Sequence, residues 1–233
     1  MSERLHLPGG REVVLGWAEV RPEPVEDSSF SALEREGLAR CRTDKRRREF
    51  VAGRLAAHRA LALLEPGLRA EVTARQDGPD AGRPLFCPER GLALSISHSA
   101  GLAVAGVARG GALGVDLEQR VEASAAFLEE AFAPGEHEGY LAVCEGRMDA
   151  VTAAWTLKEA VLKVWGVGLR APLQKVAVRP VLLHADGGRL SLRVTLETAE
   201  GLPPGLGEPP SMLAALLVAG PGRVLAIAGQ APP

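Results

Sequence analysis

The chain has 233 residues, a net charge of −2, 46% hydrophobic residues and 24% charged residues. This composition is ordinary for a globular protein of one large or two small domains, and its charge gives no general attraction to nucleic acid or to membranes. No run approaches the roughly 18 apolar residues of a membrane helix. The three cysteines, Cys41, Cys87 and Cys144, are too few and too widely spaced to predict a disulfide framework or a zinc site. With no apolar leader at the N-terminus, we expect reduced thiols and a cytoplasmic location.

The first half begins with one strand pattern and two helix patterns. Alternating apolar residues predict a strand over residues 11–20. Ser31 with Glu34 three residues later is the signature of a capping box, which predicts a helix that runs to about residue 41. Apolar residues at helical spacing then predict a long helix from Asp44 to Leu64.

A turn-rich loop over residues 76–84 leads from these helices to three strand-like runs. The runs cover residues 92–97, 102–108 and 113–118. Because Gly110 and Gly111 stand between the second run and the third, they predict a hairpin turn that joins the two strands.

The second half repeats the mixture of helices and strand pairs. A helical region over residues 123–144 is broken by Pro134 and Gly135, and a strong helix is predicted from Ala150 to Trp165. Four strand-like runs form two hairpins, over residues 176–183, 190–196, 212–219 and 224–228. We therefore predict an α+β protein with an N-terminal half, residues 1–112, and a C-terminal half, residues 113–233. No internal repeat is legible in the sequence, although a duplicated architecture stays open.

Two carboxylates share one face of the strand predicted over residues 113–118. Side chains alternate along a strand, so Leu113, Val115 and Leu117 point to one side, while Asp116 and Glu118 point to the other, about 7 Å apart. Two like charges this close favour a hard cation such as magnesium between them. Gly114 on the same face is expected to leave room for a bulky ligand. The alternative is a solvated strand face whose carboxylates pair with arginines.

The helix predicted over residues 150–165 carries a lysine in its apolar stripe. Lys158 lies among the apolar side chains on a helical wheel, and a buried lysine requires an anionic partner. Glu159 and Lys163, one turn apart at the edge of the stripe, could be an ordinary ion pair of a few tenths of a kcal/mol. That pairing does not account for Lys158.

Two further segments offer groups that bind phosphate. The run Ser95–Ser99 places hydroxyls and His98 at the end of a strand, although a lone histidine is more often structural. The basic run Lys45–Arg48, followed by Arg54, can bind phosphate through charge-assisted hydrogen bonds, or can simply be a solvated helix face.

Together, the order and spacing of these segments resemble the 4′-phosphopantetheinyl transferases, in particular the larger Sfp-type members. The matching segments, in chain order, are Arg48 with Ala52-Gly53-Arg54, Gly82-Arg83-Pro84, Ser95–Ser99, Gly114–Glu118, Trp155–Glu159 with Lys163, and Gly166 to Leu173. Arg83 stands where the family usually has a lysine, which leaves its contact open because the two cations differ in geometry.

This resemblance implies a pseudo-twofold fold of two similar α+β halves with coenzyme A bound between them. It implies magnesium ligation by Asp116, Glu118 and Glu159, although some relatives use a water molecule in place of the residue at Glu118. Glu159 and Lys163 are the expected catalytic residues. The residues expected to hold coenzyme A and its phosphates are Lys45, Arg48, Arg54, Arg83, Ser97, His98, Asp116, Lys158 and Lys163. Glu136 is expected to contact the residues of the site and not the bound ligands themselves.

The implied reaction moves the phosphopantetheine arm of coenzyme A onto a serine of an acyl or peptidyl carrier protein and releases 3′,5′-ADP. Sfp-type members activate polyketide and nonribosomal peptide synthetases, but the sequence leaves the carrier open among fatty-acid, polyketide, peptide-synthetase and siderophore carriers. A monomer suffices. The helical region over residues 123–143 is a candidate carrier surface through Phe127, Leu128, Phe132 and Leu141, unless these residues belong to the core. Two other functions stay open: a nucleotide-binding module without chemistry, and a magnesium-dependent phosphohydrolase.

Overall fold

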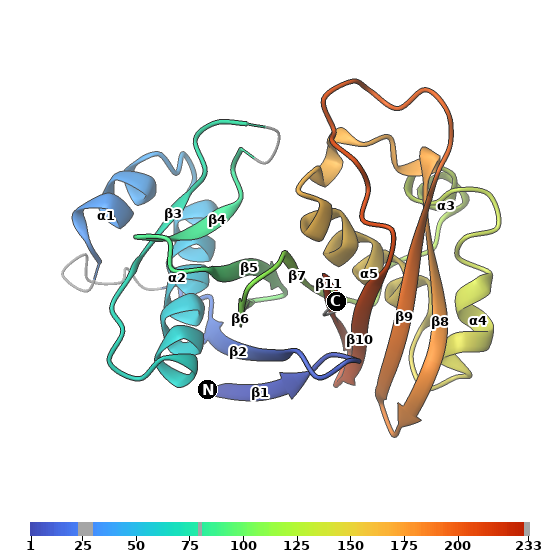
Figure 1. Cartoon of the computed structure of the whole chain (residues 1–233), viewed down its shortest axis with the longest axis horizontal. Helices are drawn as coiled ribbons and strands as arrows, with labels where there is room; N and C mark the ends of the chain where they lie inside the picture. The colour runs from blue at the N-terminus through green and yellow to red at the C-terminus, as the bar shows by residue number, and fades with distance from the viewer. Residues whose placement is uncertain (23–29, 79–80, 231–233) are drawn as a thin grey trace. The chain divides into compact units, whose positions relative to one another are not determined.

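The computed structural model describes residues 1–22, 30–78 and 81–230, and it has the α+β class that the sequence predicts (Figure 1). Contacts within the chain divide it into two units. Unit 1 comprises Met1–Leu5 and Glu12–Gly111, and unit 2 comprises His6–Arg11 and Ala112–Pro233. Part of the predicted loop over residues 76–84, namely residues 79 and 80, lies outside the described residues. No helix in the described ranges is long and apolar enough to cross a membrane.

Unit 1 is built on a four-stranded sheet with the order β1-β2-β6-β5. Its strands are β1 (Ser2–His6), β2 (Glu12–Glu19), β5 (Leu92–Ser99) and β6 (Leu102–Arg109). The long helix α2 (Asp44–Leu64) packs on β2 and β6 through small residues such as Ala56 and Ala60, both fully buried. The short helix α1 (Ala32–Ala39) lies against a separate strand pair, β3 (Glu71–Ala74) and β4 (Pro84–Cys87). The sequence did not predict β1, β3 or β4.

The two helices of unit 1 begin where the sequence predicts. Ser31 accepts a hydrogen bond from the backbone of Glu34, whose side chain accepts one in return from the backbone of Ser31. This capping box satisfies two backbone donors that the first turn of α1 leaves without helical partners. Thr43 accepts a bond from the Arg46 backbone and starts α2 in the same way.

Unit 2 is built on a five-stranded sheet with the order β7-β11-β10-β9-β8. Its strands are β7 (Leu113–Gln119), β8 (Val176–Asp186), β9 (Arg189–Thr198), β10 (Leu213–Gly220) and β11 (Arg223–Gln230). The helix α5 (Ala150–Trp165) packs on β7 and β11. It ends at Gly166, whose φ of 80° is a left-handed cap that glycine adopts easily. The helices α3 (Ala125–Ala131) and α4 (Gly139–Cys144) occupy the region that Pro134 and Gly135 interrupt.

The hairpin predicted at Gly110 and Gly111 is wrong. β6 pairs with β2 and β5 in unit 1, whereas β7 pairs with β11 in unit 2. The tight turn instead lies between β5 and β6, where Ala100 and Gly101 both have positive φ. A double glycine is a local signal for a turn, but the partner of β7 is set by pairing with a strand about a hundred residues later in the chain.

The two units repeat one topology. In each, the first strand of the repeat pairs antiparallel with the last strand, and the last pairs with the one before it, so β2, β6 and β5 correspond to β7, β11 and β10. In each, one long helix covers this strand group: α2 in unit 1 and α5 in unit 2. The duplicated architecture that the sequence left open is therefore present within the two folds.

A glycine in the first strand of each repeat lets the helix approach the sheet. A Cβ on Gly16 would lie 2.0 Å from the carbonyl oxygen of Ala56, and a Cβ on Gly114 would lie 1.8 Å from that of Ala160. Neither distance tolerates a side chain. The prediction that Gly114 makes room for a ligand is thus wrong, because the backbone of α5 fills that space.

Candidate active site

The strand β7 and the helix α5 bring acidic and basic side chains together at the edge of the unit 2 core. Asp116 lies on the face of β7 that is covered by α5, two residues after Gly114, and is only 4% exposed. Lys163 of α5 donates one hydrogen bond of 2.7 Å to Asp116 Oδ1 and a second of 2.9 Å to the carbonyl oxygen of Val115. Lys163 is therefore held both by the strand backbone and by the carboxylate.

Glu159, one turn before Lys163 on α5, is a carboxylate with a raised pKa. Burial, followed by the negative charge of Asp116, raises the pKa of Glu159 from 4.5 to about 7, although the positive charge of Lys163 opposes this. Glu118 adds a smaller repulsion of the same sign. A carboxylate with a pKa near neutrality is suited to accept a proton at physiological pH.

The three acidic residues predicted as metal ligands are thus close enough to influence one another. Among residues 1–22, 30–78 and 81–230, however, no three His, Cys, Asp or Glu side chains converge tightly enough to hold a metal ion by themselves. Magnesium in phosphate-transfer sites is usually held by one or two carboxylates together with substrate phosphates and water. The oxygen donors and their mutual repulsion therefore fit a magnesium ion that arrives with a phosphate ligand.

Lys158 has the buried anionic partner that its position requires. It is fully buried and donates a 2.7 Å bond to Glu136 and a 2.8 Å bond to the carbonyl oxygen of Leu173. Glu136, 1% exposed, also accepts bonds from the backbones of Ala133 and Val178. Lys158 therefore faces the interior, and its predicted contact with phosphate is not supported. The pair instead ties α5 to the start of β8.

Unit 1 contains a counterpart of this buried glutamate. Glu34, 2% exposed, accepts bonds from the backbone three residues before it, at Ser31, and from the β3 backbone at Val72. Glu136 makes the same two kinds of bond, to Ala133 and to Val178 of β8. In unit 1 the side-chain partner of the glutamate is His58, whose Nε2 lies 2.7 Å from Glu34 Oε1. The duplication thus extends to buried polar groups as well as to the strands.

A pocket of about 990 Å³ lies within unit 1, beside the start of α2. Its lining combines basic groups with backbone from the loop around Gly82, and its basic members are Arg40, Arg42, Arg46, Arg54 and His98. The His98 ring lies 3.1 Å from an Arg46 guanidinium nitrogen and 3.7 Å from Glu49. Arg46 belongs to the basic run Lys45–Arg48 that the sequence offered as a phosphate-binding segment, whereas Arg40 and Arg42 were not singled out from the sequence.

Arg54 is the most buried cation of this pocket. Its guanidinium stacks 3.5 Å from the centre of the Phe50 ring, and burial lowers its pKa from 12.5 to about 10, which leaves it charged at neutral pH. The Arg54 Nε atom is buried and has no hydrogen-bond partner among the described residues. A phosphate oxygen in the pocket would supply that partner.

The remaining residues predicted to hold coenzyme A are not all in this pocket. Lys45 extends into solvent near Glu49, at 3.8 Å, and Ser97 is buried in β5. Arg83 lies between two residues of the pocket lining, Gly82 and Pro84, but does not line it. Arg48 instead lines a second pocket, on another face of α2. Lys45, Arg54 and His98 therefore lie in one region, while Arg48 does not.

The candidate carrier surface over residues 123–143 is mostly core. Phe132 is 3% exposed, and Phe127 and Leu128 pack against the same cluster, where the Phe127 ring lies edge-on to Trp155 at 5.4 Å. Leu141 alone of the four is exposed, at 66%. The alternative that these residues form core is thus correct for three of them.

Comparison with known proteins matches each of the two units to one superfamily. A model of the 4′-phosphopantetheinyl transferase N-terminal domain matches residues 34–108, and a model of the 4′-phosphopantetheinyl transferase superfamily matches residues 112–200. A holo-[acyl-carrier-protein] synthase of Roseiflexus sp. (strain RS-1) is 39% identical over 67 residues, which cover 27% of this chain and 46% of that protein. The chain thus spans about half the length of this curated relative. The two family matches, one in each unit, establish that the chain belongs to the 4′-phosphopantetheinyl transferase superfamily.

Proposed function

We propose that this protein transfers the phosphopantetheine arm of coenzyme A to a serine hydroxyl of a carrier protein and releases 3′,5′-ADP. The observation that carries the proposal is Glu159, a half-buried carboxylate with a pKa near 7 beside Asp116 and Lys163, in a chain of this superfamily. The related synthase from Roseiflexus is named for the same kind of product.

The described residues suit the separate parts of this reaction. Glu159 is suited to take the proton of the serine hydroxyl as it attacks the phosphorus atom. Lys163, held by Val115 and Asp116, places a positive charge next to the carboxylates, where negative charge develops on the departing phosphate. The basic pocket of unit 1, with Arg54 at its centre, is suited to the phosphate groups of the nucleotide.

Asp116, Glu118 and Glu159 would hold a magnesium ion together with the substrate phosphates. When bound, the ion neutralises phosphate charge and polarises the phosphorus that is attacked. Transfer at phosphorus depends mainly on such positioning and electrostatic stabilisation, and in the proposed reaction the nucleophile is the serine of the carrier protein.

We also propose the Sfp-type subclass, with polyketide or nonribosomal peptide carriers as partners, a monomeric state and a cytoplasmic location. These finer assignments rest on the sequence segments described above. A comparison of several apo carriers as substrates tests the partner class.

The decisive test is the intact mass of an apo carrier protein after incubation with this protein, coenzyme A and magnesium. We expect the carrier to gain the mass of one phosphopantetheine, and we expect EDTA or the Glu159→Gln substitution to prevent the gain. Consumption of coenzyme A without a carrier would instead identify a phosphohydrolase. Binding of coenzyme A with neither outcome, across several carriers, would identify a binding module.

A further inference from the structure

Unit 1 has a second pocket, which shares α2 with the basic pocket but uses a different face of that helix. The second pocket measures about 830 Å³. Its lining residues from α2 are spaced three and four apart, which places them on one helix face, and they are Asp44, Arg47, Arg48, Val51, Leu55 and Arg59. The basic pocket takes Arg46, Glu49, Phe50, Gly53 and Arg54 from another face. The function proposed above makes no use of the second pocket.

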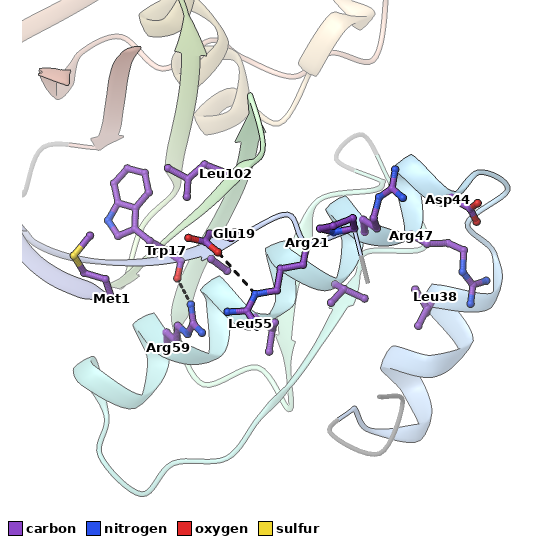
Figure 2. A pocket seen from close by; sticks show the side chains of 14 residues that line it. Met1, Trp17, Glu19, Arg21, Leu38, Asp44, Arg47, Leu55, Arg59 and Leu102 are labelled. Carbon is purple, nitrogen blue, oxygen red and sulfur yellow. Dashed lines mark hydrogen bonds and ion pairs between the residues drawn. The ribbon is translucent and has the colours of Figure 1, made fainter. Parts of the chain in front are cut away.

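The internal repeat relates this pocket to the candidate active site. Arg59 donates a hydrogen bond to the carbonyl oxygen of Trp17, the residue after Gly16 (Figure 2). Lys163 donates to the carbonyl oxygen of Val115, the residue after Gly114. Arg59 follows the contact residue Ala56 by three positions, just as Lys163 follows Ala160. Arg59 is therefore the unit 1 counterpart of Lys163.

The same correspondence shows what the unit 1 pocket lacks. The residue two positions after the strand glycine is Asp116 in unit 2 and Ala18 in unit 1. The residue just before the helix alanine is Glu159 in unit 2 and Leu55 in unit 1. Both Ala18 and Leu55 line the second pocket. The cation is kept, but the acidic side chains that would hold a metal are replaced by apolar ones.

The remaining lining strengthens the positive character of the pocket. It contains four arginines, Arg21, Arg47, Arg48 and Arg59, against two carboxylates, Glu19 and Asp44. The Glu19 carboxylate lies 3.8 Å from Arg21. Arg47 and Arg48 make no ion pair or side-chain hydrogen bond with any residue that the structure describes. The apolar side chains of the lining include Leu38, Val51, Leu55 and Leu102.

We propose that this pocket is a metal-independent binding site for a small organic anion with one phosphate group and an apolar body. A planar guanidinium pairs with phosphate through two parallel hydrogen bonds, and Arg47 and Arg48 are available for such pairing. Leu55, Val51 and Leu102 receive the apolar part. Pockets of this size with an apolar lining and a few convergent polar groups are typical of small-molecule sites.

Titration of the full chain with octyl phosphate by calorimetry, in EDTA and with excess coenzyme A, tests the proposal. We expect one site that binds octyl phosphate at least tenfold more tightly than either inorganic phosphate or octanol. The double variant Arg47→Gln/Arg48→Gln is expected to weaken binding at least tenfold. The matched control, Arg69→Gln/Arg90→Gln, removes the same charge from exposed residues of unit 1 outside both pockets and is expected to leave binding unchanged.

A second pair of variants tests the correspondence with the active site. Leu55→Glu places in unit 1 the acidic residue that unit 2 has at the equivalent position, Glu159, and is expected to abolish octyl phosphate binding. The neutral Leu55→Gln is expected to lower binding less. Thermal melting checks that each variant is folded. The proposal is overturned if octyl phosphate does not bind, if coenzyme A displaces it, if both arginine pairs reduce its binding equally, or if Leu55→Glu and Leu55→Gln bind it alike.

Discussion

Glu159→Gln is expected to stabilise unit 2 at alkaline pH and to have little effect in acid. The pKa of Glu159 rises from 4.5 to about 7 on folding, mainly through burial and then through repulsion from Asp116. Because the folded pKa lies above the unfolded one, the contribution of the neutral carboxyl to stability is fully present below pH 4.5 and is lost as the pH rises through about 7. Glutamine keeps the neutral form at every pH, so the variant avoids this loss.

The size of the effect follows from the pKa shift. At about 1.4 kcal/mol for each pKa unit, the ionised carboxylate costs at most roughly 3 kcal/mol, and partial exposure of Glu159 reduces this to about 1–2 kcal/mol. The variant should therefore exceed the parent by about 1–2 kcal/mol in free energy of unfolding near pH 8.5, and by close to zero near pH 4.5.

Urea unfolding in EDTA measures this difference, with tryptophan fluorescence as the signal. A Trp17→Phe background leaves Trp155 and Trp165, both in α5, so that the fluorescence reports on unit 2. When magnesium and coenzyme A replace EDTA, magnesium should stabilise the parent at alkaline pH more than the glutamine variant, since binding to the folded state raises stability. A stability difference that does not change with pH would refute the assigned ionisation of Glu159, and equal stabilisation of both proteins by magnesium would refute its role as a ligand.

Three further predictions concern packing and charge. Gly114→Ala should lower the free energy of unfolding of unit 2 by about 3 kcal/mol or more in urea, because the new Cβ collides with the Ala160 backbone. The control, Gly139→Ala, has nothing within 4 Å of the new Cβ and should be neutral or slightly stabilising. Equal effects of the two substitutions would contradict the close approach of α5. Lys158→Met should lower the free energy of unfolding by about 3–5 kcal/mol, because it leaves Glu136 buried without its cation. The double variant Lys158→Met/Glu136→Gln should recover part of that loss. No recovery would show that breaking the Lys158–Glu136 pair does not cause the loss of stability. Arg54→Gln should weaken coenzyme A binding at least tenfold in calorimetry without magnesium, with Arg69→Gln as the control, and unchanged affinity would place the nucleotide elsewhere.

Local signals in the sequence predicted most of the elements, and the resemblance to the family predicted one half of the candidate site. The bounds of α2 and α5 were predicted correctly because each begins at a capping residue and carries a continuous apolar stripe. Asp116, Glu159 and Lys163 were predicted together, and the structure places them together. The short strands β1, β3 and β4 were missed, since runs of four or five residues carry too few apolar positions to show a period.

The errors arose where contacts with residues far away in the sequence determine the structure around a local pattern. The glycine pair at 110–111 was interpreted as a hairpin turn, but the partner of β7 is β11, the last strand of the chain. Gly114 was assigned to a ligand, although it is the backbone of α5 that occupies the space beside it. Lys158 was correctly predicted to require an anion, yet no local pattern identifies Glu136, from the break between α3 and α4, as that anion.

The internal repeat was invisible in the sequence for a related reason. The two units share a strand glycine that a helix contacts and a helix alanine that faces this glycine. They also share a long cationic side chain, Arg59 or Lys163, that donates to the carbonyl oxygen of the residue after the glycine. Glycine and alanine are too common to reveal a repeat, and the cation differs between the units. The positions that would make the repeat obvious are the ones that diverge: Asp116 and Glu159 in unit 2 correspond to Ala18 and Leu55 in unit 1. The duplication therefore preserves the packing geometry and the cation, whereas the carboxylates that we propose for the transfer reaction are found at the unit 2 positions only.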